Sequence, residues 1–99
     1  MDLVAFEASL SGKGPPEGIV PVLEALWFDG KGDWNRAHQI VQDIPRTSAA
    51  WVHAHLHRKE GDTWNADYWY SRAGRPRPTI SLDAEWRDIV AALLGDDQK

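Results

Sequence analysis

Three histidines alternate with apolar residues in the middle of the chain, and this segment holds the residues that could do metal chemistry. It runs His53-Ala54-His55-Leu56-His57. In a strand, side chains alternate between two faces, so the three imidazoles would lie together as an open three-nitrogen zinc site. In a helix, a rotation of about 100° per residue places His53 and His57 about 40° apart on one face and turns His55 away. The helix therefore leaves two ligands at most from this segment.

The residues on both sides of the histidines favour the helix. Ala49-Ala50 precedes them and Arg58-Lys59-Glu60 follows them, so the whole stretch is composed largely of good helix formers. In this helix, His55 is expected to lie on the surface.

Two interpretations of the other histidines remain open. In the first, His53 and His57 bind zinc or another divalent ion together with a third ligand, either Asp67 or His38. In the second, which we favour, His53 and His57 pack between helices and hydrogen-bond to Tyr70 or Asp67. Chelator sensitivity of the melting temperature separates the two, because a bound ion stabilises the folded state.

A second group of candidates consists of aromatic and arginine side chains further along the chain. One predicted helix contains four aromatic residues, which is more than a single buried stripe needs. We favour packing of these rings under the last helix, around Trp86, where they would also cover the proline-rich connector of residues 75–78. The alternative is a groove for a peptide or an anionic small molecule. The candidate partner-binding residues are Trp64, Tyr68, Trp69, Arg72 and Arg75, with Arg77 beside them.

Composition excludes several classes of enzyme. The chain has 99 residues, six tryptophans and no cysteine. Without cysteine there is no disulfide framework, no thiol nucleophile and no thiolate zinc site. No serine lies in a Gly-x-Ser-x-Gly sequence, and neither common glycine-rich phosphate loop is present. An enzyme with a serine or cysteine nucleophile, or one that binds nucleotides through a glycine loop, is therefore not expected.

Charge is unevenly distributed along the chain. The net charge is −4 overall, with −4 in residues 1–45, +3 in residues 46–80 and −3 in residues 81–99. An anionic partner would prefer the middle, but the broad basic surface that nucleic acids require is missing. The first residues lack a basic segment ahead of an apolar run, and no apolar stretch approaches the roughly 20 residues of a membrane span. We therefore expect a cytoplasmic protein without nucleic-acid or membrane partners.

Glycines, prolines and capping residues divide the chain into six predicted helices, which must position these candidates. The helices cover residues 2–10, 19–29, 34–44, 48–60, 63–73 and 82–94. Asp33 is predicted to cap the third helix, Thr47 or Ser48 the fourth, and Ser81 the last. Gly74 is predicted to end the fifth helix and Gly95 the last.

The chain also contains an internal repeat. Gly32-Asp33 recurs as Gly61-Asp62, 29 residues later. At the same offset, Leu23 corresponds to Val52, Ala25 to Ala54, Trp27 to Leu56, Ala37 to Ala66 and Val41 to Tyr70. Each unit is an apolar helix, a tight Gly-Asp turn and a second helix whose small residue permits close packing.

The second unit combines small residues, the Gly-Asp turn, an aromatic residue and a proline at defined spacings. Its residues are Ala54, Gly61-Asp62, Ala66, Tyr70, Ala73 and Pro78. This pattern resembles the helical hairpins of tetratricopeptide and Sel-like repeats over residues 19–78. The resemblance implies two antiparallel hairpins and a groove that binds peptides. Residues 25–34 and 51–62 also resemble a group of small bacterial proteins, which implies no chemistry.

We therefore predict one all-α domain over residues 1–99. It comprises an N-terminal helix and Pro/Gly loop (1–18), a first hairpin (19–45), a second hairpin (47–78) and a C-terminal helix (81–95). The predicted function is a small helical-repeat interaction module for a peptide or a second copy of the chain, without a cofactor. The alternative is a metal-binding protein or metal-dependent enzyme that uses His53 and His57, with a divalent ion such as zinc.

Overall fold

The computed structural model describes residues 1–97, and six α-helices account for its regular structure. They are α1 (Leu3–Ser9), α2 (Pro21–Gly30), α3 (Trp34–Val41), α4 (Thr47–Lys59), α5 (Thr63–Ala73) and α6 (Leu82–Asp97). Residues 1–97 contain no strand, so the all-α prediction is confirmed. None of the described helices combines the length and apolar character that crossing a bilayer would require.

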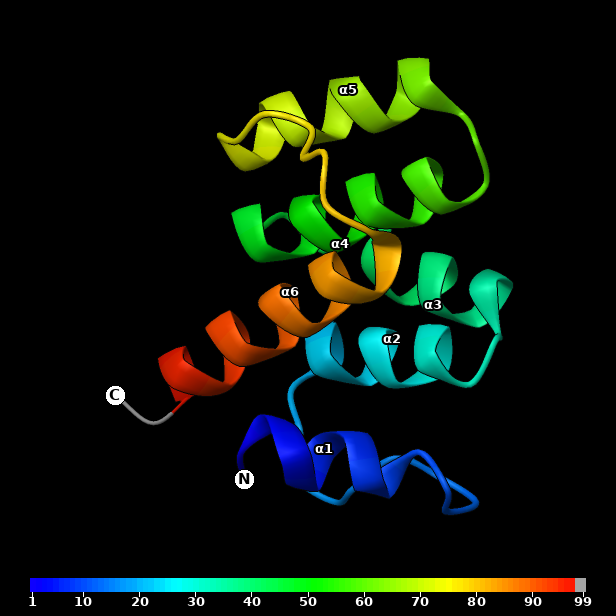
Figure 1. The fold of residues 1–99 in the computed structure, drawn as a ribbon, viewed down its shortest axis with the longest axis vertical. Coiled ribbons are helices and arrows are strands. Elements are labelled where there is room, and N and C mark those ends of the chain that lie inside the picture. The colour runs from blue at the N-terminus through cyan, green and yellow to red at the C-terminus, as the bar shows by residue number, and fades with distance from the viewer. Residues whose placement is uncertain (98–99) are drawn as a thin grey trace.

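Helices α1 to α5 are arranged along the long axis of the molecule, with α5 at one end and α1 at the other, and α6 lies across the middle (Figure 1). Helices α2 and α3 pack together across a tight turn, and α4 and α5 do the same. Helix α4 also contacts α2, α3 and α6, while α6 crosses the stack and reaches α1 and α2. The histidine-bearing helix α4 therefore lies in the middle of the fold, among four other helices.

Both predicted Gly-Asp turns are present and have the same geometry. Gly32 and Gly61 have φ angles of +86° and +83°, in the left-handed region that a Cβ atom disfavours. Asp33 and Asp62 then cap the following helices. The Oδ1 atom of each accepts a hydrogen bond from the backbone N–H three residues later, at 3.1 and 3.2 Å. The 29-residue sequence repeat is thus also a repeat of turn and cap.

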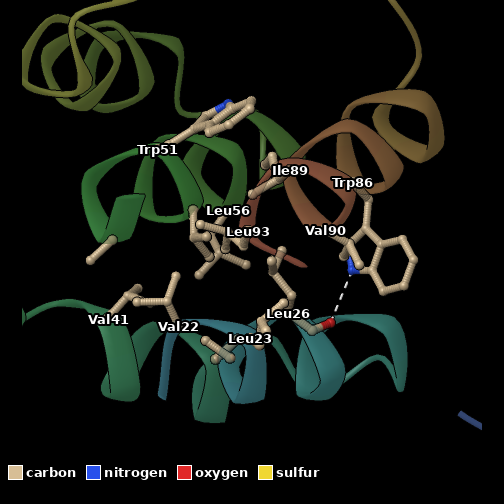
Figure 2. Packing of buried hydrophobic residues seen from close by; sticks show 14 of the residues in the cluster. Val22, Leu23, Leu26, Val41, Trp51, Leu56, Trp86, Ile89, Val90 and Leu93 are labelled. Carbon is tan, nitrogen blue, oxygen red and sulfur yellow. Dashed lines mark hydrogen bonds between the residues drawn. The ribbon is translucent and has the colours of Figure 1, made fainter. Parts of the chain in front are cut away.

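Positions paired by this repeat are equally buried. All ten residues matched at the 29-residue offset, Leu23/Val52, Ala25/Ala54, Trp27/Leu56, Ala37/Ala66 and Val41/Tyr70, are at most 2% exposed. Figure 2 shows side chains of α2, α4 and α6 meeting in a common core. The two hairpins therefore contribute equivalent positions to one hydrophobic cluster.

Trp86 anchors α6 to this cluster. Its indole Nε1–H donates a hydrogen bond to the backbone carbonyl of Leu26 at 2.9 Å (Figure 2), and its ring lies 5.8 Å from that of Phe6. At the start of α6, the Ser81 hydroxyl accepts a hydrogen bond from the Ala84 backbone N–H at 3.0 Å, as its predicted capping role requires.

Three predicted helix boundaries are wrong. Helix α3 ends at Val41, three residues before the predicted end at Ile44. Helix α4 begins at Thr47 with Arg46 in the cap position, and no side chain caps it, so neither Thr47 nor Ser48 plays that role. Helix α6 continues through Gly95, which is not among the glycines with positive φ. A helical glycine costs about 1 kcal/mol relative to alanine, but it ends a helix only where the chain turns into the left-handed region. Gly74, with φ of +75°, does so at the end of α5.

Candidate functional site

Three of the four aromatic residues of α5, Trp64, Tyr68 and Trp69, do not pack around Trp86 under the last helix. Trp64 is 76% exposed and Tyr68 is 46% exposed, and their rings stack with centroids 6.4 Å apart. Trp69 is partly buried and stacks on His53 at 3.9 Å, instead of packing around Trp86 as predicted. The favoured packing interpretation is therefore wrong for Trp64 and Tyr68, because the spacing of these residues along α5 turns them to the outside.

Arg72 continues this stripe by one further helical turn. Its guanidinium lies 5.8 Å from the Tyr68 ring centroid and 5.2 Å from that of Trp69, and Nη1 donates to the Tyr68 hydroxyl at 3.1 Å. We call the surface formed by Trp64, Tyr68, Trp69 and Arg72 the α5 face.

The other two arginines have different surroundings. Arg75 lies 3.4 Å above the ring of Trp51 in α4. Arg77 pairs with Asp67, Nε to Oδ1, at 2.7 Å. Among the side chains of residues 1–95, no carboxylate lies within ion-pair distance of Arg72 or Arg75.

Helices α3 and α4 bring three histidines together. One nitrogen from each of His38, His53 and His57 lies within 4.8 Å of the other two. The Nε2 atoms of His38 and His53 are 3.0 Å apart. Of the two third ligands that the sequence suggested, the structure places His38 in the cluster. Asp67 is exposed and pairs with Arg77 instead.

Each imidazole is held by a neighbour. Trp34 stacks on His38 with ring planes 8° apart, and its own indole N–H donates to the Leu56 carbonyl at 2.7 Å. Trp69 stacks on His53. Glu60 accepts a hydrogen bond from His57 Nδ1 at 2.6 Å. The predicted hydrogen bonds to Tyr70 or Asp67 are therefore replaced by contacts to His38 and Glu60.

The environment favours neutral rings at His38 and His53. Burial, and then the charges of His38 and His57, lower the pKa of His53 to about 4. Burial, and then His57, lower the pKa of His38. The Nδ1 atom of His53 is buried without a hydrogen-bond partner. A neutral imidazole has a free lone pair on one ring nitrogen, and it is the form of histidine that binds metal.

His55 is not on the surface, contrary to the prediction. It is 1% exposed and lies between two buried carboxylates, with Nδ1 2.7 Å from Glu85 and Nε2 3.4 Å from Asp29. Burial alone would lower the pKa of His55, but the hydrogen bonds to Asp29 and Glu85 raise it. Both ring nitrogens thus face a buried carboxylate, an arrangement that favours the protonated imidazole.

Further side chains complete this ionic network. The Tyr70 hydroxyl donates to Glu85 at 2.5 Å, Arg58 donates to Glu85 at 3.0 Å, and Lys59 donates to Asp29 at 2.8 Å. The charges of the network are therefore satisfied by each other, which is the requirement for burying them.

The repeat contained the information that would have placed His55 inside. At the 29-residue offset, His55 corresponds to Leu26, a residue of the apolar stripe of the first hairpin. Glu85 lies three residues after Leu82 and four before Ile89, on the apolar side of the last helix. Two polar residues at core positions on different helices predict a buried pair.

A pocket of about 300 Å³ opens beside the network. Two pairs of charged side chains line it, Lys59 with Asp29 and Arg87 with Glu7, and Asp83 adds a further carboxylate. We assign this pocket no function.

Comparisons with models of known protein families, with curated proteins and with solved structures found no match. The resemblance to tetratricopeptide and Sel-like hairpins accordingly stays a prediction. The α5 face and the histidine cluster are the two candidate sites of this protein.

Proposed function

We propose that this protein is a small helical interaction module that binds an acidic peptide segment of a partner through the α5 face. The observation that carries the proposal is the 76% exposure of Trp64, whose ring stacks on Tyr68. Burying apolar surface contributes a favourable free energy of roughly 25 cal/mol per Å², so a partner that covers the exposed indole would gain substantial binding free energy. Tryptophan, tyrosine and arginine are also the residue types that dominate binding energy at interfaces.

The positive charge of the middle of the chain favours an acidic partner. Residues 46–80 carry a net charge of +3, whereas both flanking segments are acidic. Within the middle segment, Arg58, Lys59 and Arg77 are already paired with carboxylates. Arg72 has no such partner among the described residues, so a carboxylate from a peptide would form a charge-assisted hydrogen bond there. Nucleic acid fits less well, because so few unpaired cations do not form a continuous basic surface.

The proposal is tested with two short fluorescent peptides of equal length. One contains glutamate and leucine, and the other has lysine at every glutamate position. Fluorescence anisotropy should show saturable binding of the acidic peptide alone. Trp64→Ala and Arg72→Glu should each weaken binding at least about tenfold, which corresponds to about 1.4 kcal/mol. Equal binding of the two peptides would contradict the proposal.

Val4→Ala is the matched control, because Val4 is also an exposed apolar side chain, at 77%, but lies on α1 at the opposite end of the molecule. Sedimentation equilibrium of the unliganded chain adds a second check. A dimer that Trp64→Ala dissociates would assign the α5 face to a second copy of the chain and contradict the peptide proposal.

A further inference from the structure

Three imidazole nitrogens from two helices converge at the α3–α4 contact, one each from His38, His53 and His57. We propose that these three histidines bind one divalent transition-metal ion, with zinc as the expected occupant. The inference rests on its own ligand set, because none of the three histidines belongs to the α5 face, although Trp69 of that face stacks on His53.

The nitrogen separations suit a metal centre. In a tetrahedral site with zinc–nitrogen bonds of about 2.0–2.1 Å, two ligand nitrogens lie about 3.3–3.4 Å apart. The Nε2 atoms of His38 and His53 are 3.0 Å apart, and the third nitrogen lies within 4.8 Å of both. Small rotations of the three rings therefore bring all three nitrogens to bonding distance from one ion.

Glu60 selects the metal-binding tautomer of His57. It accepts a hydrogen bond from His57 Nδ1, so in the neutral ring Nε2 carries the free lone pair. A carboxylate on the far nitrogen of a histidine ligand is the usual outer contact of zinc sites, because it orients the ring and raises its basicity.

The other two rings are held in place before any ion binds. Trp34 stacks on His38 and is itself anchored to the α4 backbone, while Trp69 stacks on His53. Rings fixed by packing lose little freedom when they coordinate an ion. The Nδ1 atom of His53 is buried without a partner, and the nitrogen that faces the other rings is Nε2, 3.0 Å from Nε2 of His38. Nε2 is therefore the nitrogen of His53 that would bind the ion.

The ligand set identifies the class of ion. Imidazole nitrogens suit zinc, copper, nickel and cobalt, whereas magnesium and calcium prefer oxygen. A second group of His57, Glu60 and Asp62 is also close enough to hold an ion. In that group Asp62 already caps α5 through Oδ1 and accepts from the Asn65 side chain through Oδ2, at 2.6 Å. The three histidines are therefore the better site.

The test uses the full chain, with any affinity tag removed and metal stripped by a chelator. Calorimetric titration with Zn²⁺ should show one ion per chain, and Zn²⁺ should raise the melting temperature. Co²⁺ should give the intense visible absorption of a tetrahedral site. His38→Gln and His57→Gln should each lower zinc affinity at least about 100-fold, because two ligands remain. Glu60→Gln should lower it about 10–100-fold and leave the cobalt spectrum tetrahedral.

Asp67→Asn and Trp64→Ala are the matched controls and should bind zinc like the unmodified chain. Circular dichroism confirms that each variant folds, and His38, which is only partly buried, is the ligand whose replacement should disturb the fold least. The proposal is overturned if the stripped chain takes up no zinc, or if His38→Gln and His57→Gln bind it as tightly as the unmodified chain. If the chain binds zinc but does not bind the acidic peptide, the proposed function is refuted and the zinc site is not.

Discussion

Glu85 accepts hydrogen bonds from three side chains on two other helices. They are His55 and Arg58 of α4 and Tyr70 of α5. Glu85 is 1% exposed, so its charge is stabilised by these donors and hardly at all by water. Burial by itself would raise the pKa of Glu85, but the hydrogen bonds from His55 and Tyr70 lower it. At the scale of single residues, this carboxylate therefore links α6 to α4 and α5.

Replacing Glu85 with glutamine should destabilise the protein strongly. The change leaves the cations of His55 and Arg58 without their shared anion, and breaking a buried ion pair costs about 3–5 kcal/mol. Urea unfolding at pH 7 measures the loss. Glu7→Gln is the control, because Glu7 forms an exposed pair with Arg87 at 3.2 Å and should contribute at most about 1 kcal/mol. Equal effects of the two substitutions would show that the buried network contributes no special stability.

The same network predicts a loss of stability in acid. The pKa values of Asp29 and Glu85 are lowered from their ordinary values of 3.8 and 4.5. For Asp29, burial would raise the pKa, but hydrogen bonds from His55 and Lys59 outweigh burial and lower it. A carboxylate with a lowered pKa stabilises the folded state fully above its unfolded pKa, and this contribution is lost as the pH falls through the folded value. The free energy of unfolding should therefore decrease as the pH falls below about 5. Glu85→Gln should show a shallower decrease, and parallel curves would rule out Glu85 as a cause.

At the scale of elements, the two Gly-Asp turns determine how each hairpin folds back. Gly61 has φ of +83°, and a Cβ atom at this position would meet no other atom within 4 Å. The requirement for glycine is therefore one of backbone conformation and not of space. The same holds for Gly32, its partner in the repeat.

Gly61→Val should therefore lower stability by about 1–2 kcal/mol or more, the cost of left-handed backbone for a residue with a Cβ. Gly95→Ala provides a contrast of opposite sign. Gly95 lies inside α6 without positive φ and with open space around it, so alanine should stabilise by about 0.5–1 kcal/mol. Differential scanning calorimetry of both variants checks the pair. If the Gly61→Val variant has the same melting temperature as the unmodified chain, the turn tolerates another conformation.

At the scale of the whole molecule, α6 closes the core over both hairpins. It contacts α1, α2 and α4, and Trp86 carries a hydrogen bond to the Leu26 carbonyl in addition to its packing against Phe6. Trp86→Ala should cost about 3–5 kcal/mol, the usual range for a large buried aromatic. Urea unfolding measures this cost. A loss below about 1 kcal/mol would mean that α6 is not part of the cooperative unit.

Local features were predictable from the sequence because they depend on residues a few positions apart. Asp33, Asp62 and Ser81 cap helices through backbone groups three residues away, and the glycines of both turns have the expected positive φ. The prediction missed the boundary of α6 at Gly95, where the conformation of a permissive residue is decided by its surroundings. The prediction also placed Trp64 and Tyr68 inside. It failed there because the helices that pack against α5 determine which of its faces is buried.

The sequence by itself determined the helical class, the two turns and the repeat whose paired positions fill the core. Only the tertiary structure decided which side chains meet. The contact of α3 with α4 brought His38, and not Asp67, to His53 and His57. The crossing of α6 over α4 placed Glu85 against His55, 30 residues away in the chain. Caps and turns are settled by nearby residues, whereas the partners of a charged or metal-binding side chain depend on how separate helices pack.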